Sequence, residues 1–177
     1  MNQKPIPESY WVLPDLFLAG ATPVHRFDET ITRQRLAGFL ADGFDTFFDL
    51  STEGDRPAYQ AALKDEAGRL NRQVLYRRYS FPDFGVPRVE AMTSVLDDID
   101  SALAQDRKVY LHCVGGIGRT GTTVGCWLVR HGMEPGKALS HLGELYRESA
   151  QSFFAPHSPE TEEQARFILD WNEHGLA

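Results

Sequence analysis

The stretch VYLHCVGGIGRTG, residues 109–121, decides the local fold around which the rest of this chain is arranged. It begins with a short apolar run, Val109–His112, which is typical of a strand buried inside a sheet. Three glycines follow and allow the backbone to curl into a tight loop. A helix is predicted from Arg119 to His131. The stretch therefore predicts a strand, a loop and a helix start in immediate succession.

This loop has the composition of an anion-binding site. Its successive backbone N–H groups can point inward, and the helix start adds unpaired N–H groups with a positive dipole end. The planar guanidinium of Arg119 can hold two oxygens of an oxyanion, and the same groups favour a thiolate nucleophile at Cys113. The predicted phosphate-binding residues are Val114, Gly115, Gly116, Ile117, Gly118 and Arg119.

A second informative stretch is SFPDFGVP, residues 80–87. Asp83 stands between aromatic residues, a glycine and prolines, which indicates a loop that can shield a carboxyl group from water. Gly85 is a candidate hinge. A thiolate that attacks phosphorus needs an acid to protonate the leaving oxygen, and Asp83 is the candidate. The alternative is that Asp83 is only a turn residue or a helix N-cap before Pro87.

Short apolar runs alternate with helical patterns along the chain, which predicts an α/β fold with a central, mostly parallel sheet flanked by helices. Pro87 and Pro159 are assigned to first helical turns, and Ser158 to an N-cap. Strands are expected at residues 11–13, 16–19, 45–50, 74–79 and 109–112, and helices at 32–40, 58–70, 87–104, 119–131, 135–147 and 159–172.

Composition limits the classes of protein that remain. The chain has 177 residues, of which 42% are hydrophobic and 24% charged, so we expect one domain over 1–177 with a core of about 10–172. There is neither a membrane-spanning run nor a signal-peptide core at the N-terminus, which predicts a cytoplasmic protein. The net charge of −7 argues against nucleic acid and membranes as partners.

Taken together, the motifs identify a family. The segment 112–121, a cysteine followed by five residues and an arginine with flanking His and Thr-Gly, resembles the signature of the protein tyrosine phosphatases. The segment 82–87 resembles their mobile acid loop, and 158–164 their glutamine loop. The resemblance implies a tyrosine phosphatase-like fold. The small size resembles the compact dual-specificity group, whereas the acid loop is nearer to that of the tyrosine-specific enzymes.

The resemblance implies a two-step mechanism without metal or cofactor. Cys113 attacks phosphorus while Asp83 protonates the leaving oxygen, and Asp83 then acts as the base when water hydrolyses the cysteinyl-phosphate. Thr120 would donate a hydrogen bond to Cys113. His112 would set the environment of the thiolate, although it is equally readable as a strand-end histidine bonded to backbone.

The glutamine loop departs from the pattern of the tyrosine-specific enzymes, which carry two glutamines four residues apart. Here Glu160 takes the first position and Gln164 the second. Gln164 therefore remains as the candidate that positions the hydrolytic water, while Glu160 also suits a helix N-terminus.

The uncharged loop residues favour a substrate with a single phosphate. We expect a phosphoprotein or phosphopeptide, above all phosphotyrosine, with phosphoserine and phosphothreonine as further substrates and free phosphate or other oxyanions as loop ligands. The alternatives are a phosphatase of inositol phosphates or other small molecules, and a non-catalytic phosphate-binding module. A sulfurtransferase or an arsenate reductase would also use a loop cysteine, but neither predicts the Asp83 loop.

Four residues outside these motifs could be either structural or functional. Cys126 is expected in the core, with a redox partnership with Cys113 as the alternative. Arg78 is expected to be solvated rather than in contact with substrate. Asp49 is expected to be a loop or cap residue, and Tyr59 either packs or lines the pocket.

Overall fold

The computed structural model describes residues 4–173, and residues 1–3 and 174–177 of the predicted 1–177 domain lie outside the described part. Five strands form one sheet in the order β1-β2-β5-β3-β4. Strands β2, β5, β3 and β4 are parallel, and β1 pairs with β2 in the antiparallel sense. The strands are β1 (Ser9–Leu13), β2 (Phe17–Gly20), β3 (Thr46–Asp49), β4 (Leu75–Arg78) and β5 (Val109–His112).

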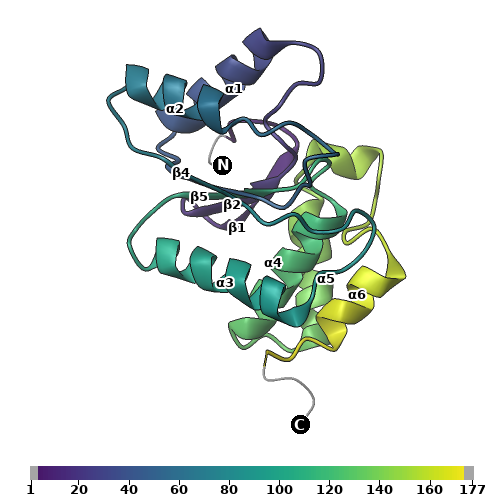
Figure 1. Ribbon diagram of the computed structural model, residues 1–177. Coiled ribbons are helices and arrows are strands. Elements are labelled where there is room, and N and C mark those ends of the chain that lie inside the picture. Colours follow the sequence, from purple (N-terminus) through teal and green to yellow (C-terminus); the bar gives the residue numbers. More distant parts are fainter. Residues whose placement is uncertain (1–3, 174–177) are drawn as a thin grey trace.

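Helices cover both faces of this sheet, as Figure 1 shows: α1 and α2 lie on one side, and α3 to α6 lie on the other. The predicted α/β architecture is therefore confirmed. None of the helices in the described part of the chain is long and apolar enough to cross a bilayer. The helices are α1 (Glu29–Ala41), α2 (Gln60–Arg69), α3 (Val89–Leu103), α4 (Gly118–Arg130), α5 (Pro135–Tyr146), α6 (Glu162–Leu169) and the 3-10 helix η1 (Ala150–Phe153).

The two faces of the sheet enclose separate apolar cores. Side chains alternate along a strand, so neighbouring residues of β5 enter different cores. Tyr110 packs with Phe39 and Phe47 beneath α1 and α2, whereas Val109 and Leu111 belong to the core beneath α3 and α4. This burial on both faces explains why the strand sequences are almost continuously apolar.

The carboxyl ends of four strands form one row across the sheet. The registers pair Gly20 with His112, His112 with Asp49, and Asp49 with Arg78. The chain builds β2, β3 and β4 outward through α1 and α2, then returns through α3 to insert β5 between β2 and β3. Loops beside such an inserted strand diverge toward opposite faces and leave a crevice, which is where α/β proteins place ligands.

Three predicted helix starts are wrong in position. Helix α1 begins at Glu29 rather than residue 32, because the Asp28 carboxylate accepts hydrogen bonds from the N–H groups of Thr30 and Ile31. Helix α3 begins at Val89, so Pro87 precedes it instead of occupying its first turn.

The start of α6 is the third correction. Its N-cap is Thr161, whose side chain accepts from the N–H of Gln164, while the Gln164 side chain accepts from the N–H of Thr161 in a capping box. Ser158 instead donates its hydroxyl to the carbonyl of Ile117 at 2.8 Å, and Pro159 lies before the helix. The capping box satisfies more backbone groups than a serine cap could, which explains the later start.

Candidate active site

The loop after β5 places the Cys113 thiol at the base of a backbone cradle. Its Sγ accepts a hydrogen bond from the N–H of Gly116 at 3.3 Å, and only 3% of the residue is exposed. Helix α4 begins at Gly118, and no side chain caps it at Ile117. The free N–H groups and positive dipole end of a 13-residue helix therefore face the same loop.

Gly116 shows why this loop needs glycine. Its φ of +73° lies in the left-handed region, and a Cβ built there would come within 2.2 Å of the Gly20 carbonyl carbon. The loop is pressed against the end of β2, where the N–H of Thr22 also donates to the carbonyl of Val114 at 3.1 Å. The cradle is thus shaped by the neighbouring strand as well as by its own sequence.

Arg119 spans the site with its guanidinium held on three sides. Nη1 lies 2.5 Å from Asp55 Oδ2 and donates to the carbonyl of Phe81 at 3.3 Å, and Nη2 lies 3.0 Å from Asp83 Oδ1. Burial opposes the charge of Arg119, but its hydrogen bond to Asp55 and the charges of Cys113, Asp83 and Asp55 raise its pKa. The Nε–H is buried without a partner among the described residues. A donor so placed fits an oxyanion above the Cys113 loop.

Asp55 is a site residue that sequence reasoning missed. It lies in the loop after β3, and its carboxylate also accepts from the N–H of Thr52 at 2.8 Å. Burial opposes ionisation, but the hydrogen bonds from Arg119 and Thr52 hold the pKa of Asp55 below its usual value. Its position after a buried strand adjacent to the cysteine strand was the one available signal.

Asp83 reaches the site from the loop between β4 and α3. Its side chain is half exposed, and the neighbouring Phe84 side chain is also open to solvent. Left-handed backbone occurs at Ser80 (φ 48°) and Phe84 (φ 56°), an uncommon conformation for residues other than glycine. Gly85, the candidate hinge, is not among the positive-φ residues; its carbonyl accepts a hydrogen bond from Gln164 Nε2 at 3.1 Å.

These groups open onto one pocket of about 170 Å³. Seven of the predicted site residues line it, among them Cys113, Arg119 and Asp83, and Glu160 lines the same pocket. The carboxylates of Asp83 and Glu160, with Asp55 behind Arg119, outnumber the one guanidinium. The lining residues are Asp83, Phe84, Cys113, Val114, Gly115, Ile117, Gly118, Arg119 and Glu160.

His112 is fully buried beneath the loop and is fixed by two hydrogen bonds. Its Nδ1 lies 3.0 Å from the carbonyl oxygen of Cys113, which can only accept, so Nδ1 carries the proton. Its Nε2 lies 2.7 Å from the Tyr59 hydroxyl and accepts from it. Burial lowers the pKa of His112, which agrees with a neutral imidazole. Tyr59 therefore packs in the core and supports the loop through His112.

Asp49 connects this histidine to the next strand, and the expectation of a loop or cap residue was wrong. It lies on β3, almost fully buried, and accepts from the Tyr76 hydroxyl at 2.7 Å and from Arg78 Nη2 at 2.7 Å. Its other oxygen accepts from Ser51. Arg78 is consequently mostly buried in an ion pair rather than solvated.

Thr120 and Gln164 are both fully buried. The Thr120 hydroxyl is buried without a hydrogen-bond partner among the described residues, so it makes no bond to Cys113 here. The Gln164 Oε1 accepts from the N–H groups of Glu160 and Thr161, and its Nε2 donates to the carbonyl of Gly85. Both roles stay predictions.

Cys126 is a buried free thiol whose pKa is raised by burial.

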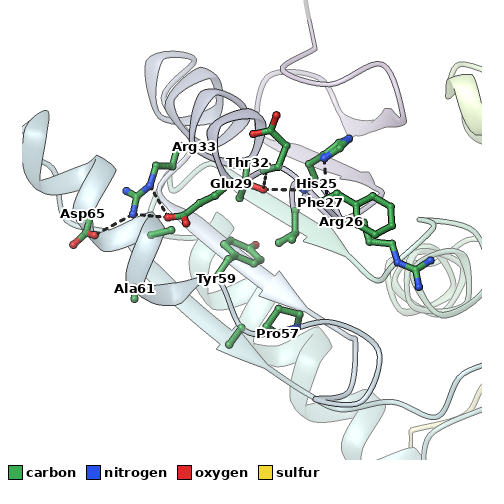
Figure 2. A pocket seen from close by; sticks show the side chains of 14 residues that line it. His25, Arg26, Phe27, Glu29, Thr32, Arg33, Pro57, Tyr59, Ala61 and Asp65 are labelled. Atoms are coloured by element: carbon green, nitrogen blue, oxygen red, sulfur yellow. Dashed lines mark hydrogen bonds and ion pairs between the residues drawn. The ribbon is translucent and has the colours of Figure 1, made fainter.

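A larger pocket of about 450 Å³ lies between the starts of α1 and α2. Figure 2 shows Arg33 on its rim, bound to Glu29 and Asp65, with the Tyr59 ring among the lining side chains. Glu66 also binds Arg33, at 3.0 Å. These carboxylates neutralise the Arg33 guanidinium.

Comparison with known proteins places the chain in a family. The family model described as "Polymorphic toxin system, DSP-PTPase phosphatase" matches residues 26–133. The chain belongs to this family of cysteine-based phosphatases. It is thereby a member of the protein tyrosine phosphatase superfamily, as the motifs predicted.

Relatives agree with this assignment over parts of their length. An uncharacterized protein of Methanocaldococcus jannaschii is 35% identical over 89 residues, 50% of this chain and 54% of the relative. Protein tyrosine phosphatase domain-containing protein 1 of Mus musculus is 30% identical over 129 residues, 68% of this chain and 17% of the relative. This phosphatase thus spans about half the length, or less, of these curated relatives.

A solved structure shows the same fold. The active form of Tk-PTP superposes with a TM-score of 0.71 at 23% identity, covering 96% of this chain and 99% of the other. The predicted tyrosine phosphatase-like fold is therefore confirmed.

Proposed function

We propose that this phosphatase hydrolyses phosphomonoesters through a cysteinyl-phosphate. In the first step the Cys113 thiolate attacks phosphorus, the bond from phosphorus to the leaving oxygen breaks, and Asp83 gives that oxygen its proton. In the second step water attacks phosphorus and the P–S bond breaks, which returns the electron pair to Cys113. The backbone cradle of residues 114–118 and Arg119 hold the phosphoryl oxygens throughout.

One observation carries this proposal. Cys113 Sγ, the Arg119 guanidinium and the Asp83 carboxyl line a single small pocket, and Arg119 keeps a buried Nε–H without a partner in the described part of the chain. A nucleophile, an oxyanion clamp and an acid are thus gathered where one phosphate fits. A non-catalytic phosphate-binding module would not need Asp83 at the mouth of the pocket.

We further propose phosphotyrosine in proteins or peptides as the preferred substrate, with phosphoserine and phosphothreonine as further substrates. The carboxylates of Asp55, Asp83 and Glu160 around one guanidinium oppose a second phosphate near the first. The exposed ring of Phe84 at the pocket offers a surface for an aromatic substrate. Among similar structures, P. aeruginosa TpbA is in complex with pTyr.

A second candidate is a phosphatase of inositol phosphates or other small molecules. It is favoured by a similar structure, the core catalytic domain of the PP-IP phosphatase SIW14 from S. cerevisiae. The balance of charge in the pocket opposes it, because a polyphosphorylated ring would bring several negative groups toward Asp83 and Glu160.

A substrate panel tests the proposal. Phosphate release should be measured from p-nitrophenyl phosphate, a phosphotyrosyl peptide, the matching phosphoseryl peptide and inositol hexakisphosphate, with Cys113→Ser as the control. We expect Cys113→Ser to be inactive and the phosphotyrosyl peptide to be the best physiological-type substrate. If Cys113→Ser released phosphate as fast as the wild type, the cysteine mechanism would be overturned. If phosphate were released faster from inositol hexakisphosphate than from the phosphotyrosyl peptide, the substrate assignment would be overturned.

For the setting, we propose one phosphatase domain over 1–177, acting in the cytoplasm on a phosphorylated protein. The free thiols of Cys113 and Cys126 support a reducing compartment. Thr120 is proposed as a donor to the leaving thiolate, His112 as a residue that sets the environment of the thiolate, and Gln164 as the residue that positions the hydrolytic water. No metal, cofactor or nucleic acid enters the proposed reaction.

A further inference from the structure

Glu160 brings a second carboxyl group to the catalytic pocket, at the position where the tyrosine-specific enzymes carry the first of two glutamines. It lines the pocket with Cys113, Arg119 and Asp83. A Cβ on Gly118 would lie 3.0 Å from Glu160 Oε2, so the carboxylate rests directly over the backbone of the phosphate loop. Asp83 enters the same pocket from the loop before α3, whereas Glu160 enters from the segment before α6. The two carboxyl groups thus come from independent loops.

The backbone of Glu160 is fixed while its carboxylate stays free. Its N–H donates to Gln164 Oε1 at 3.1 Å, and two residues earlier Ser158 is bonded to the carbonyl of Ile117. No hydrogen bond or ion pair engages the Glu160 side chain among residues 4–173, and the residue is exposed. A carboxylate with an anchored backbone and open lone pairs is suited to hold a water molecule.

The neighbouring charges favour proton uptake at this position. Partial desolvation of the carboxyl group first, and then the negative charge of Asp83, raise the pKa of Glu160, while Arg119 opposes them. Asp83 becomes negative when it has given its proton to the leaving group. Glu160 is therefore made more basic at the stage when water must be deprotonated.

Asp83 is less free to do that work. Its Oδ1 lies 3.0 Å from Arg119 Nη2, so once Asp83 has given up its proton its carboxylate pairs with the guanidinium. Glu160 has no such partner in the described structure. The two carboxyl groups therefore have different environments: Asp83 pairs with Arg119, and Glu160 faces the pocket.

We propose that Glu160 is a catalytic residue that accepts the proton of the hydrolytic water in the second step. This inference rests on the proposed function. Water oxygen bonds to phosphorus, the P–S bond breaks and its electron pair returns to Cys113 Sγ. One water proton passes to the Glu160 carboxylate and the other stays on the phosphate that leaves. The Glu160 carboxylic acid then loses its proton to solvent, and Asp83 takes up a proton from solvent before the next turnover.

Pre-steady-state kinetics with p-nitrophenyl phosphate test the assignment. Glu160→Gln keeps the size of the side chain and its capacity to bond water but removes the base. We expect a burst of about one p-nitrophenol per enzyme at the wild-type rate, followed by a steady rate lowered about 100-fold. Acid quenching during the steady state should trap phosphate on Cys113. Glu160→Asp should recover part of the steady rate.

Glu163→Gln is the matched control, because this exposed residue lies in the first turn of α6 and does not line the catalytic pocket. We expect it to behave as the wild type. The proposal is overturned if Glu160→Gln keeps the full steady rate. A glutamine can hold the water molecule but cannot take its proton, so no base would then be needed at this position. It is also overturned if burst and steady rate fall together, which would place Glu160 in the first step. Failure of the proposed function is a different result: a wild type that forms no cysteinyl-phosphate.

Discussion

The carboxylate of Asp55 holds the guanidinium of Arg119 at 2.5 Å, although the two residues are 64 positions apart in the chain. Asp55 follows β3 and Arg119 follows β5, and these strands are neighbours in the sheet. The ion pair therefore joins two loops at the carboxyl edge and fixes the plane of the arginine fork. A fork fixed in advance loses less entropy when it binds phosphate.

Replacing Asp55 with alanine should weaken catalysis through Arg119. Loss of the partner lets the guanidinium rotate, and small misplacement of a positioning group is costly. We expect kcat/KM for p-nitrophenyl phosphate to fall about 10-fold to 100-fold, and inhibition by inorganic phosphate to weaken. Asp65→Ala is the control, because that exposed carboxylate lies far from the phosphate loop and pairs with Arg33 at 3.6 Å. Tighter phosphate binding in Asp55→Ala would contradict the orienting role and indicate simple charge neutralisation.

Asp83→Asn should slow the first step according to the leaving group. An asparagine cannot protonate the departing oxygen, and general acid catalysis contributes about 100-fold or more. We expect kcat for phenyl phosphate to fall by about that factor, and kcat for p-nitrophenyl phosphate to fall less because nitrophenolate leaves readily. Asp97→Asn, a change in an exposed partner of Arg130, should leave both rates unaltered. Equal losses for the two substrates would argue against proton transfer by Asp83.

Two adjacent glycines offer a comparison within the phosphate loop. Gly116→Ala forces a Cβ to within 2.2 Å of the Gly20 carbonyl carbon at a positive φ, so the cradle must move away from β2. At Gly115 the nearest atom to a new Cβ is Ile117 Cδ1 at 3.4 Å, an ordinary contact. We expect activity to fall at least about 100-fold in Gly116→Ala and by a smaller factor in Gly115→Ala. Similar losses of activity in both variants would show that the close contact with β2 is not the reason why residue 116 must be glycine.

The buried pair of Asp49 and Arg78 predicts a pH-dependent stability. Burial opposes the charge of Asp49, yet His112, Ser51 and Tyr76 together hold its pKa below the ordinary value. The unfolded carboxyl therefore binds its proton at a higher pH than the folded one. The stabilisation is complete above about pH 4 and is lost as the pH falls through the lowered pKa.

Asp49→Asn should accordingly cost about 3 kcal/mol of unfolding free energy at pH 7, because it leaves Arg78 without its buried partner. The difference from the wild type should shrink toward pH 3. Urea unfolding at both pH values measures it. Asp45→Asn, which breaks a pair with the partly exposed Arg107, should cost less than about 1 kcal/mol at either pH. A constant loss for Asp49→Asn between pH 7 and 3 would show that its charge does not stabilise the fold.

The helix boundaries show the limits of local pattern. Pro87 and Ser158 are residue types that often occur at helix starts, yet α3 begins at Val89 and α6 begins at Glu162. The start of α6 depends on a tertiary contact, because the Ser158 hydroxyl donates to the carbonyl of Ile117 in the phosphate loop and cannot cap the helix. A residue cannot cap a helix with a group that a distant segment has taken.

The sequence by itself determined the family, the α/β fold and the cysteine–arginine loop, because these depend on residue types at fixed short spacing. Only the tertiary structure decided that Asp55 holds Arg119, that Asp49 joins His112's strand to Arg78, and that Glu160 shares the pocket with Asp83. Asp55 and Arg119 follow the neighbouring strands β3 and β5, Asp49 and Arg78 pair across β3 and β4, and Asp83 and Glu160 lie in loops far apart in the chain. Proximity of that kind depends on strand order and register, which no local spacing encodes.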